Sequence, residues 1–430
     1  MARLDRRHFL SLCAATALPT LTLSAARRMR QQPGAAASFP ALRQRIGGQP
    51  LAYLDSAATT LRPKAVIDAL SDFYSTDNAN PAPVHALARR AAARLTAARQ
   101  TVARFINAPS PNEVIFTRGS TEGINLIAGT WGAANLRAGD EVILTIAEHN
   151  SNLLPWTRAA KQAGATVRVV DVDDEGRLRV DQLRQMISAK TRLIAFSHVS
   201  NVLGLVNPAK EICAVGRAAG ARTVIDGAQA VPHVSVDVQD LGCDFYVFSG
   251  HKTLGPMATG VVWGRLELLD AMPPYHVGSN MAHEADFERS TMEHGALKFQ
   301  AGTPDVAGPV GLAAAIDFLA AMGTGAAWRH DQDLVRHGLA RLREVKGLRI
   351  IGPTSPENRV PVFTFVMAGK APAAIAAALD ANGIAIRAGD MAALPLLKRF
   401  GVSEAARASA YVYSSRDDID RLADGLAAQI

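Results

Sequence analysis

The sequence predicts an α/β protein with a doubly wound, mostly parallel sheet, and three observations carry this prediction. Short runs rich in Val, Ile and Phe alternate with helix-length stretches between about residues 111 and 265. Each run is nearly continuous in hydrophobicity, which is typical of strands buried on both faces. The 430 residues, of which 48% are hydrophobic, are enough for a large core and suggest two to three domains.

Seven runs are expected to form this sheet, because alternation of strands and helices favours a doubly wound arrangement. They are EVIFT (113–117), EVILTIA (141–147), TVRVVDV (166–172), RLIAFSHV (192–199), TVIDG (223–227), FYVFSG (245–250) and GVVWG (260–264). Helices are expected over 122–136, 208–220 and the Ala-rich 306–346. Strands at 361–368, 383–389 and 409–414, with a closing helix, predict a smaller α+β domain.

The positive charge of the chain is concentrated at its N-terminus. Six arginines and one aspartate give residues 1–30 a net charge of +5, out of +7 for the whole chain. The remainder is nearly neutral and shows no basic stripe, which disfavours a nucleic-acid partner. The charge therefore indicates a feature of the N-terminal segment itself.

That segment has the pattern of an export signal. Arg6 and Arg7 precede a mildly apolar stretch, residues 9–26, which is too short and too polar for a transmembrane helix. The pair resembles a twin-arginine signal, with small-residue cleavage sites after Ala26 or Ala37. We therefore predict that residues 1–37 are a signal and linker, and that the mature protein is periplasmic without stable membrane insertion. The alternative is a basic tail or an uncleaved anchor, with a cytoplasmic protein if the signal is not used.

The strongest local sign of chemistry is Lys252, which follows the predicted strand 245–250. A lysine there lies at the carboxyl edge of the sheet, where α/β proteins bind ligands. Asp226 ends the strand 223–227, and Gln229 follows it. A carboxylate at a strand end can hold the cationic ring nitrogen of pyridoxal 5'-phosphate (PLP), and a lysine can attach that cofactor.

A phosphate cradle is expected in TRGSTEGIN (117–125), between a strand and a helix start. Backbone N–H groups and the hydroxyls of Ser120 and Thr121 can hold a phosphate in such a loop. Taken one at a time, each of these elements also fits an ordinary cap, turn or surface residue. The chain has no GxGxxG fingerprint, Walker A loop or HExxH motif, and its three cysteines argue against a disulfide scaffold or a Cys-rich metal site.

Seven blocks appear in the order and at the spacing of a known family. They are YLDSAATTLRP (53–63), FTRGSTEGINLIAGTWG (116–132), EHNSNLLPW (148–156), HVSNVLGLVNP (198–208), VIDGAQAVPH (224–233), CDFYVFSGHKTLGP (243–256) and FQAGTPD (299–305). From about Tyr53 to Leu426 the chain resembles fold-type I PLP enzymes of aminotransferase class V, in the SUF-type cysteine desulfurase/selenocysteine lyase branch. The resemblance implies an N-terminal segment (38–65) that packs on the small domain, a large PLP-binding domain (66–305) and a small C-terminal domain (306–430).

The resemblance also implies residue roles. Lys252 would attach the cofactor, Asp226 would pair with the pyridine nitrogen, and His149 would stack over the ring; Lys252 and His149 are the implied catalytic residues. The other implied cofactor contacts are Ser120, Thr121, Asn201, Gln229, Ser249 and His251, joined by Thr303 from the other subunit of a homodimer. Arg407 matches the arginine that binds a substrate α-carboxylate, for which a bidentate guanidinium is suited.

The chain departs from the family where the substrate enters. The nucleophilic cysteine of the desulfurase loop corresponds to Ala392 in RAGDMAALP (387–395), and the two preceding histidines correspond to Asp390 and Met391. Near residues 81–90 the chain reads PAPVHALARR; His85 is expected to match a substrate-side histidine, but the Arg-Gly pair before it is lost. Alanine cannot accept sulfur, and Cys213 and Cys243 are expected to be packed in the core.

These features favour a PLP-dependent enzyme that acts on an α-amino acid. With Ala392 in the acceptor position, β-elimination at a C–S or C–Se bond is the expected reaction. Three alternatives stay open: a true cysteine desulfurase that uses another thiol, an aminotransferase or epimerase, and a non-catalytic PLP-fold binding protein. A homodimer is expected, and neither a metal ion nor a nucleic acid is.

Overall fold

The computed structural model describes residues 35–429. The predicted export signal therefore lies outside the described residues, apart from its last few positions. Residues 35–43 form two short 3₁₀ turns, η2 (Ala35–Ser38) and η3 (Pro40–Arg43).

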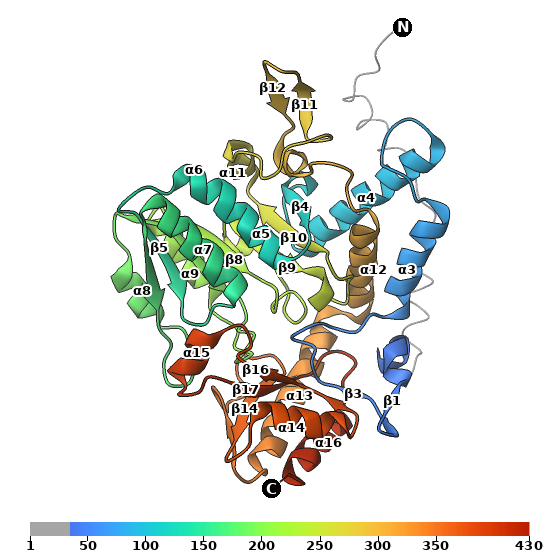
Figure 1. Ribbon diagram of the computed structural model, residues 1–430, viewed down its shortest axis with the longest axis vertical. Helices are drawn as coiled ribbons and strands as arrows, with labels where there is room; N and C mark the ends of the chain where they lie inside the picture. The colour runs from blue at the N-terminus through green and yellow to red at the C-terminus, as the bar shows by residue number, and fades with distance from the viewer. Residues whose placement is uncertain (1–34, 430) are drawn as a thin grey trace.

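All seven predicted runs are strands of one mixed sheet (Figure 1). Its order is β4-β10-β9-β8-β7-β5-β6, and β10 runs antiparallel to both neighbours while the other adjacent pairs are parallel. The strands are β4 (Val114–Thr117), β5 (Glu141–Thr145), β6 (Thr166–Val170), β7 (Thr191–Ser197), β8 (Arg222–Asp226), β9 (Phe245–Ser249) and β10 (Gly260–Gly264). The predicted fold class, with a mostly parallel sheet, is confirmed.

The sheet is buried on both faces because its side chains alternate between two cores. Tyr246 and Phe248 of β9 pack into one core, whereas Phe245 and Val247 pack into the other. Helices cover the two faces (Figure 1). They are α4 (Ala86–Phe105), α5 (Ser120–Ile127), α7 (Asn150–Ala163), α8 (Val180–Met186), α9 (Ala209–Ala218), α10 (Val238–Leu241) and α11 (Leu266–Ala271).

The helix expected over 122–136 is divided into three pieces. After α5 the chain forms a π-helical turn over Ala128–Gly132 and then the short α6 (Ala133–Asn135). The helix expected over 306–346 is also two helices, α12 (Ala307–Met322) and α13 (Thr324–Arg343). Helix α12 packs against α4 and α3 (Lys64–Thr76), so the domain boundary predicted after residue 305 precedes a helix that lies against the large domain.

The C-terminal region contains a four-stranded antiparallel sheet in the order β13-β14-β17-β16. Its strands are β13 (Leu348–Ile350), β14 (Val362–Met367), β16 (Arg387–Gly389) and β17 (Ala405–Ser409), and its helices after α13 are α14 (Pro372–Asp380), α15 (Leu394–Arg399) and α16 (Arg416–Ala427). The strand expected over 383–389 is two strands, because β15 (Ile384–Ala385) pairs with β3 (Ala52–Tyr53) before β16 pairs with β17.

The strand predicted over 409–414 is wrong. The strand is β17, with the sequence AARAS, and residues 410–414 form a buried turn. Tyr411 and Tyr413 are buried there because their hydroxyls find partners, the carbonyl of Pro232 and the hydroxyl of Ser56. Pairing with β14 and β16 decides the strand, although Ala and Arg have low strand propensity.

Two small hairpins were not expected from the sequence. One is β1 (Arg45–Ile46) with β2 (Gln49–Pro50), which precedes β3. The other, β11 (Ala282–Ala285) with β12 (Ser290–Met292), projects from the large domain in Figure 1.

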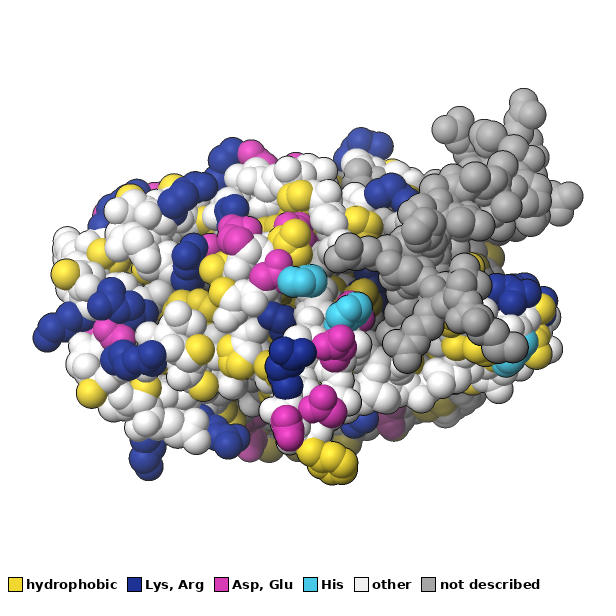
Figure 2. Space-filling model, turned by 90° about the horizontal axis from the view of Figure 1, so that it is seen from above, with side chains coloured by type: hydrophobic (Ala, Val, Ile, Leu, Met, Phe, Trp, Pro, Cys, Tyr) yellow, Lys and Arg dark blue, Asp and Glu magenta, His cyan; other side chains and the backbone are white. Residues whose placement is uncertain are grey.

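Positive and negative side chains are mixed over the face seen in Figure 2.

Two searches of the described residues bear on membranes and metals. Within residues 35–429, no single helix has the length and hydropathy of a membrane span; only α12 and α13 taken together pass, with a bend of 79° between them. Across the same residues, no group of three or more His, Cys, Asp or Glu side chains is arranged to hold a metal ion.

Candidate active site

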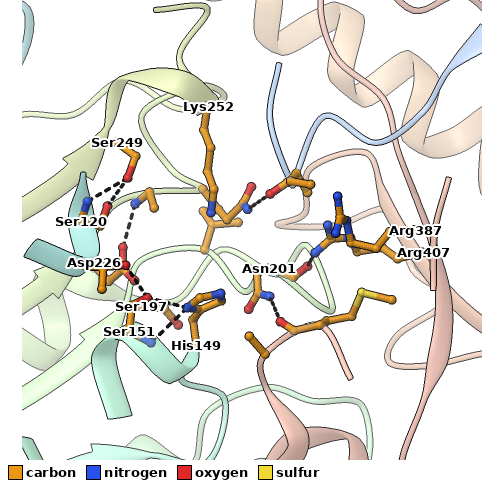
Figure 3. A pocket seen from close by; sticks show the side chains of 18 of the residues that line it. Ser120, His149, Ser151, Ser197, Asn201, Asp226, Ser249, Lys252, Arg387 and Arg407 are labelled. Atoms are coloured by element: carbon orange, nitrogen blue, oxygen red, sulfur yellow. Dashed lines mark hydrogen bonds between the residues drawn. The ribbon is translucent and has the colours of Figure 1, made fainter. Parts of the chain in front are cut away.

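A cleft of about 450 Å³ opens where the carboxyl ends of the large sheet meet the small domain (Figure 3). Parallel strands place the loops that follow them at one edge, which is why residues distant in sequence converge here. The cofactor residues predicted for this chain's own site all line the cleft: Ser120, Thr121, His149, Asn201, Asp226, Gln229, Ser249, His251 and Lys252. Arg407 and Ala392 line it from the small domain.

Lys252 and Asp226 come from the ends of neighbouring strands, β9 and β8. Burial and the positive charges of Arg407 and Arg387 lower the pKa of Lys252 to about 8, against the opposing effect of Asp226. Burial raises the pKa of Asp226, while a hydrogen bond from the Ala228 amide and the charge of Lys252 lower it. The lysine is therefore an amine that can lose its proton near neutral pH, and the aspartate is a buried acid that a cationic group would stabilise as the anion.

Hydroxyl groups gather at the N-terminus of α5. Ser249 Oγ accepts a hydrogen bond from the Ser120 amide at 2.8 Å and lies 2.8 Å from Ser120 Oγ. Gly119 precedes them with φ +143°, a conformation that favours glycine, and a Cβ there would lie 3.3 Å from Ser249 Oγ. A helix N-terminus ringed by hydroxyls is a suitable binding site for a phosphate.

His149 caps the N-terminus of α7, where its Nδ1 accepts a hydrogen bond from the Ser151 amide at 3.1 Å. Burial and the charges of Lys252 and Arg407 lower the pKa of His149 to about 4, and Asp390 opposes this effect. The imidazole is therefore neutral at physiological pH. Ser151, which lines the cleft and hydrogen-bonds Thr121, was missed in the sequence, although it stands only two positions after His149.

Glu148 is a buried acid that the sequence analysis did not single out. It accepts hydrogen bonds from Asn152 Nδ2 at 2.7 Å, the Ser197 amide at 3.1 Å and Thr145 Oγ1 at 2.5 Å. Burial raises its pKa to about 8. These contacts fasten the loop that carries His149 to the end of β7, so Glu148 positions the histidine.

Asn201 and Gln229 connect the cleft to other segments. The side chain of Asn201 donates to the carbonyl of Met391 at 2.8 Å, and the backbone carbonyl of Asn201 accepts from Arg407 Nη1 at 2.9 Å. Gln229 donates to the carbonyl of Ala57 at 2.6 Å, so the N-terminal segment forms part of the wall.

Arg407 lies opposite Arg387 across β17 and β16. Arg407 is only 2% exposed, and its Nε is buried without a hydrogen-bond partner among residues 35–429. Asp55 binds Arg387 through contacts of 2.8 to 3.2 Å and approaches Arg407 Nη2 at 3.6 Å. Burial lowers the pKa of Arg407 to about 10, so it is still a cation at neutral pH. Because Arg407 lines the cleft, its guanidinium is the cation with which an incoming carboxylate would pair.

The segment that departs from the family is an ordered turn on the cleft wall. Met391 and Ala392 have φ of 54° and 51°, in the left-handed region. The turn is held because the Asn150 amide donates to the Ala392 carbonyl at 2.7 Å and Asp390 Oδ1 accepts from the Ala392 amide at 2.9 Å. Ala392, which the resemblance predicts to replace the family's cysteine, is therefore held in a defined position on the cleft wall.

Two predicted residues lie elsewhere in this chain. His85 caps α4, and its Nδ1 accepts a hydrogen bond from the Ala88 amide at 3.3 Å, which gives it a structural role within the described residues. Thr303 is exposed in the loop before α12 and does not line the cleft of its own chain. A contact from a second subunit stays a prediction for Thr303.

The described thiols are remote from the cleft. Cys213 in α9 and Cys243 before β9 are both fully buried in the core of the large domain. Burial raises the pKa of Cys213 to about 12 and that of Cys243 well above its ordinary value. Cys243 lies before the first residue of β9, whereas the cleft lies at the opposite end of that strand. Neither group is a reactive thiolate near neutral pH.

The cleft has the groups that PLP requires. Asp226 offers an anion for a ring nitrogen, Lys252 an amine for attachment, and the start of α5 a phosphate site. Ser197, which lines the same cleft, has a buried Oγ without a hydrogen-bond partner in the part of the chain that the structure describes. Such orphaned groups are uncommon unless a ligand completes them.

Comparisons with known proteins agree with this geometry. The chain is 44% identical over 389 residues to a probable cysteine desulfurase of Halalkalibacterium halodurans, covering 90% of this chain and 95% of that one. It is 43% identical to a cysteine desulfurase of Synechococcus elongatus, but spans only 61% of that relative's length. The crystal structure of the Escherichia coli cysteine desulfurase CsdA superposes with a TM-score of 0.84 at 37% identity, over 91% of this chain and 96% of that one.

The family itself is defined by a match over most of the chain. The aminotransferase class-V family model matches residues 52–422, which include both sheets and every residue that lines the cleft. The chain therefore belongs to the class V aminotransferase family and is a PLP-dependent enzyme of fold type I.

Proposed function

We propose that this protein is a PLP-dependent lyase that cleaves the C–S or C–Se bond of an amino acid by β-elimination. The observation that carries the proposal is that Ala392 lines the cleft; by the sequence resemblance, this residue takes the place of the nucleophilic cysteine. An alanine cannot form a persulfide, so sulfur or selenium has to leave with its own substituent.

The overall reaction balances without a protein thiol. A cysteine conjugate, R–S–CH₂–CH(NH₃⁺)–COO⁻, and water give pyruvate, ammonium and R–SH. The Cβ–S bond breaks with its electron pair on sulfur, which then takes up a proton. No oxidant or reductant is required.

Each of the cleft residues has a separate role in this reaction. Arg407 binds the α-carboxylate through its guanidinium, which lines the cleft. When bound, PLP withdraws electrons from the α-carbon of an attached amino acid. Asp226 is placed to hold a proton on the ring nitrogen. Lys252, with its pKa lowered to about 8, takes the proton from the α-carbon. His149 is neutral and borders the same space.

The desulfurase names of the relatives suggest a second candidate, a true desulfurase with a different thiol. The burial and raised pKa values of Cys213 and Cys243 disfavour it. Transamination and racemisation use the same proton removal at the α-carbon, and they are distinguished by their products.

The test is a product assay with purified holoenzyme. L-Cysteine, L-selenocysteine and S-alkyl cysteines are each incubated with the protein, and pyruvate, keto acids, sulfide and free thiol or selenol are quantified. We expect equal amounts of pyruvate and thiol or selenol from a substituted substrate, and no product from Lys252→Ala. A keto acid that retains the sulfur, or racemised substrate alone, would contradict the lyase assignment.

We further propose that the protein is a periplasmic homodimer exported through its twin-arginine signal. The proposal depends on Arg6, Arg7 and the apolar stretch after them, together with the exposed position of Thr303. Cell fractionation of the wild type and an Arg6→Lys/Arg7→Lys variant tests export, and light scattering of the purified protein tests the dimer. Processed protein in the cytoplasm, or a monomer with full activity, would contradict it.

A further inference from the structure

Two arginines, Arg387 and Arg407, line the substrate side of the cleft, and the carboxylate of Asp55 already interacts with both. Arg387 and Arg407 face each other across β16 and β17, so their positive charges repel. Asp55, whose side chain is 13% exposed, binds Arg387 through its Nε and Nη2 and lies 3.6 Å from Arg407. Asp55 therefore fills the fork that Nε and Nη2 of Arg387 would otherwise offer to a ligand carboxylate. Arg407, which Asp55 approaches only to 3.6 Å, is left to bind the α-carboxylate of a substrate.

A second carboxylate stands on the wall next to this anchor. Asp390 lines the cleft, is exposed, and follows directly after β16, which carries Arg387. Its Oδ1 caps the turn by accepting from the Ala392 amide, and its charge acts on His149 across the cleft. A negative substituent on the β-carbon of a substrate would therefore meet a negative side chain.

We propose that Asp55 and Asp390 make this cleft selective for α-amino acids that carry no second acidic group. Asp55 removes the site at which a second carboxylate would bind, and Asp390 repels one. The inference rests on the proposed function, since it concerns the substrate of the same site, and it narrows that substrate to amino acids with an uncharged or cationic group beyond the β-carbon.

The expected size of the effect follows from partial exposure. Arg387 has a side chain that is 48% exposed, so solvent weakens its interaction with a ligand charge. At such sites a nearby unit charge changes affinity by about tenfold or less. Asp55→Asn releases Arg387 for an acidic ligand, and Asp390→Asn removes the repulsion while an asparagine oxygen still caps the Ala392 amide.

The experiment compares two ligands of the same shape, L-asparagine and L-aspartate. Each is titrated into the holoenzyme, and the apparent Kd is read from the change in the visible absorbance of the cofactor. The proteins are the wild type, Asp55→Asn, Asp390→Asn and the double variant. Asp68→Asn is the matched control, because Asp68 is an exposed α3 carboxylate that pairs with Lys64 at 2.6 Å, outside the cleft.

We expect the wild type to bind asparagine at least about tenfold more tightly than aspartate, and each cleft variant to reduce that ratio by about threefold to tenfold. The double variant should approach equal binding, and Asp68→Asn should keep the wild-type ratio. Equal affinity of the wild type for asparagine and aspartate, or an unchanged affinity ratio in Asp390→Asn, overturns the proposal. The Asp390→Asn variant keeps its turn, so this test holds even if Asp55→Asn folds poorly. Neither ligand has a leaving group for elimination, so the binding ratio is measured independently of the proposed reaction. If the ratio is as expected but the separate assay with S-alkyl cysteines gives no pyruvate and thiol, only the proposed reaction is contradicted. If neither ligand changes the absorbance of the cofactor, both the proposed selectivity and the proposed reaction are contradicted.

Discussion

The replacement of Arg407 by lysine is the most informative single change in the substrate site. Lysine keeps the positive charge but cannot offer two parallel N–H donors to a carboxylate. Arg407 is buried and lines the cleft, so its planar guanidinium is placed to hold a bound α-carboxylate by two hydrogen bonds, one of which lysine would lose. A hydrogen bond to a charged group contributes about 1.5–3 kcal/mol, which corresponds to a loss of about tenfold to a hundredfold in affinity.

The assay is the apparent Kd for L-alanine, read from the cofactor absorbance, together with kcat/KM for an S-alkyl cysteine. The matched control is Arg387→Lys, because Arg387 is half exposed and already bound to Asp55. We expect Arg407→Lys to retain the cofactor but to lose affinity tenfold to a hundredfold, and Arg387→Lys to lose much less. An unchanged Kd in Arg407→Lys, or a larger loss in Arg387→Lys, would refute the assignment of Arg407 as the carboxylate anchor.

Four further predictions follow from the same geometry. Because the pKa of Lys252 is lowered to about 8 and the neutral amine accepts the proton, kcat should rise with pH through about 8 and level off above it, in a pH–rate profile. Asp226→Asn should lower kcat by about a hundredfold to a thousandfold in steady-state assays, since the buried anion is lost. The Cys213→Ala/Cys243→Ala variant should lose about 1 kcal/mol of unfolding free energy per site by denaturant titration, yet keep its product yield. Ala392→Cys should place a thiol in the cleft and give a protein-bound sulfane sulfur with L-cysteine, detectable as a mass increase of one sulfur atom; an unmodified thiol after turnover would contradict this.

The large sheet could be predicted because its strands are buried on both faces. Continuous apolar runs such as those of β9 and β10 can be recognised as strands from the local sequence, before their neighbours in the sheet are known. The strands of the small domain were harder to predict. Strand β17 has the sequence AARAS, and it is a strand only because β14 and β16 pair with it on either side. The apolar Tyr411–Tyr413 region satisfied the strand pattern, but its hydroxyls are held in a turn.

The cofactor half of the cleft was predictable for a related reason. Lys252 and Asp226 each follow a recognisable strand, and parallel strands bring such positions to one edge. The substrate half depends on contacts between distant segments. Asp55 and Arg387 are 332 positions apart, and no local pattern indicates that they pair. Glu148 was not predicted as a site residue, because a glutamate next to a histidine is expected to be exposed, whereas in the structure it is buried.

In the proposed reaction, this cleft eliminates sulfur or selenium without a thiol of its own. The most direct test is a variant in which Cys13, Cys213 and Cys243 are all alanine, incubated as holoenzyme with S-methyl-L-cysteine. Pyruvate and methanethiol are then measured against time. We predict equal amounts of both products, formed at a rate close to that of the wild type. Loss of both products in the thiol-free variant, with the cofactor still bound, would show that a cysteine is required and would contradict the account.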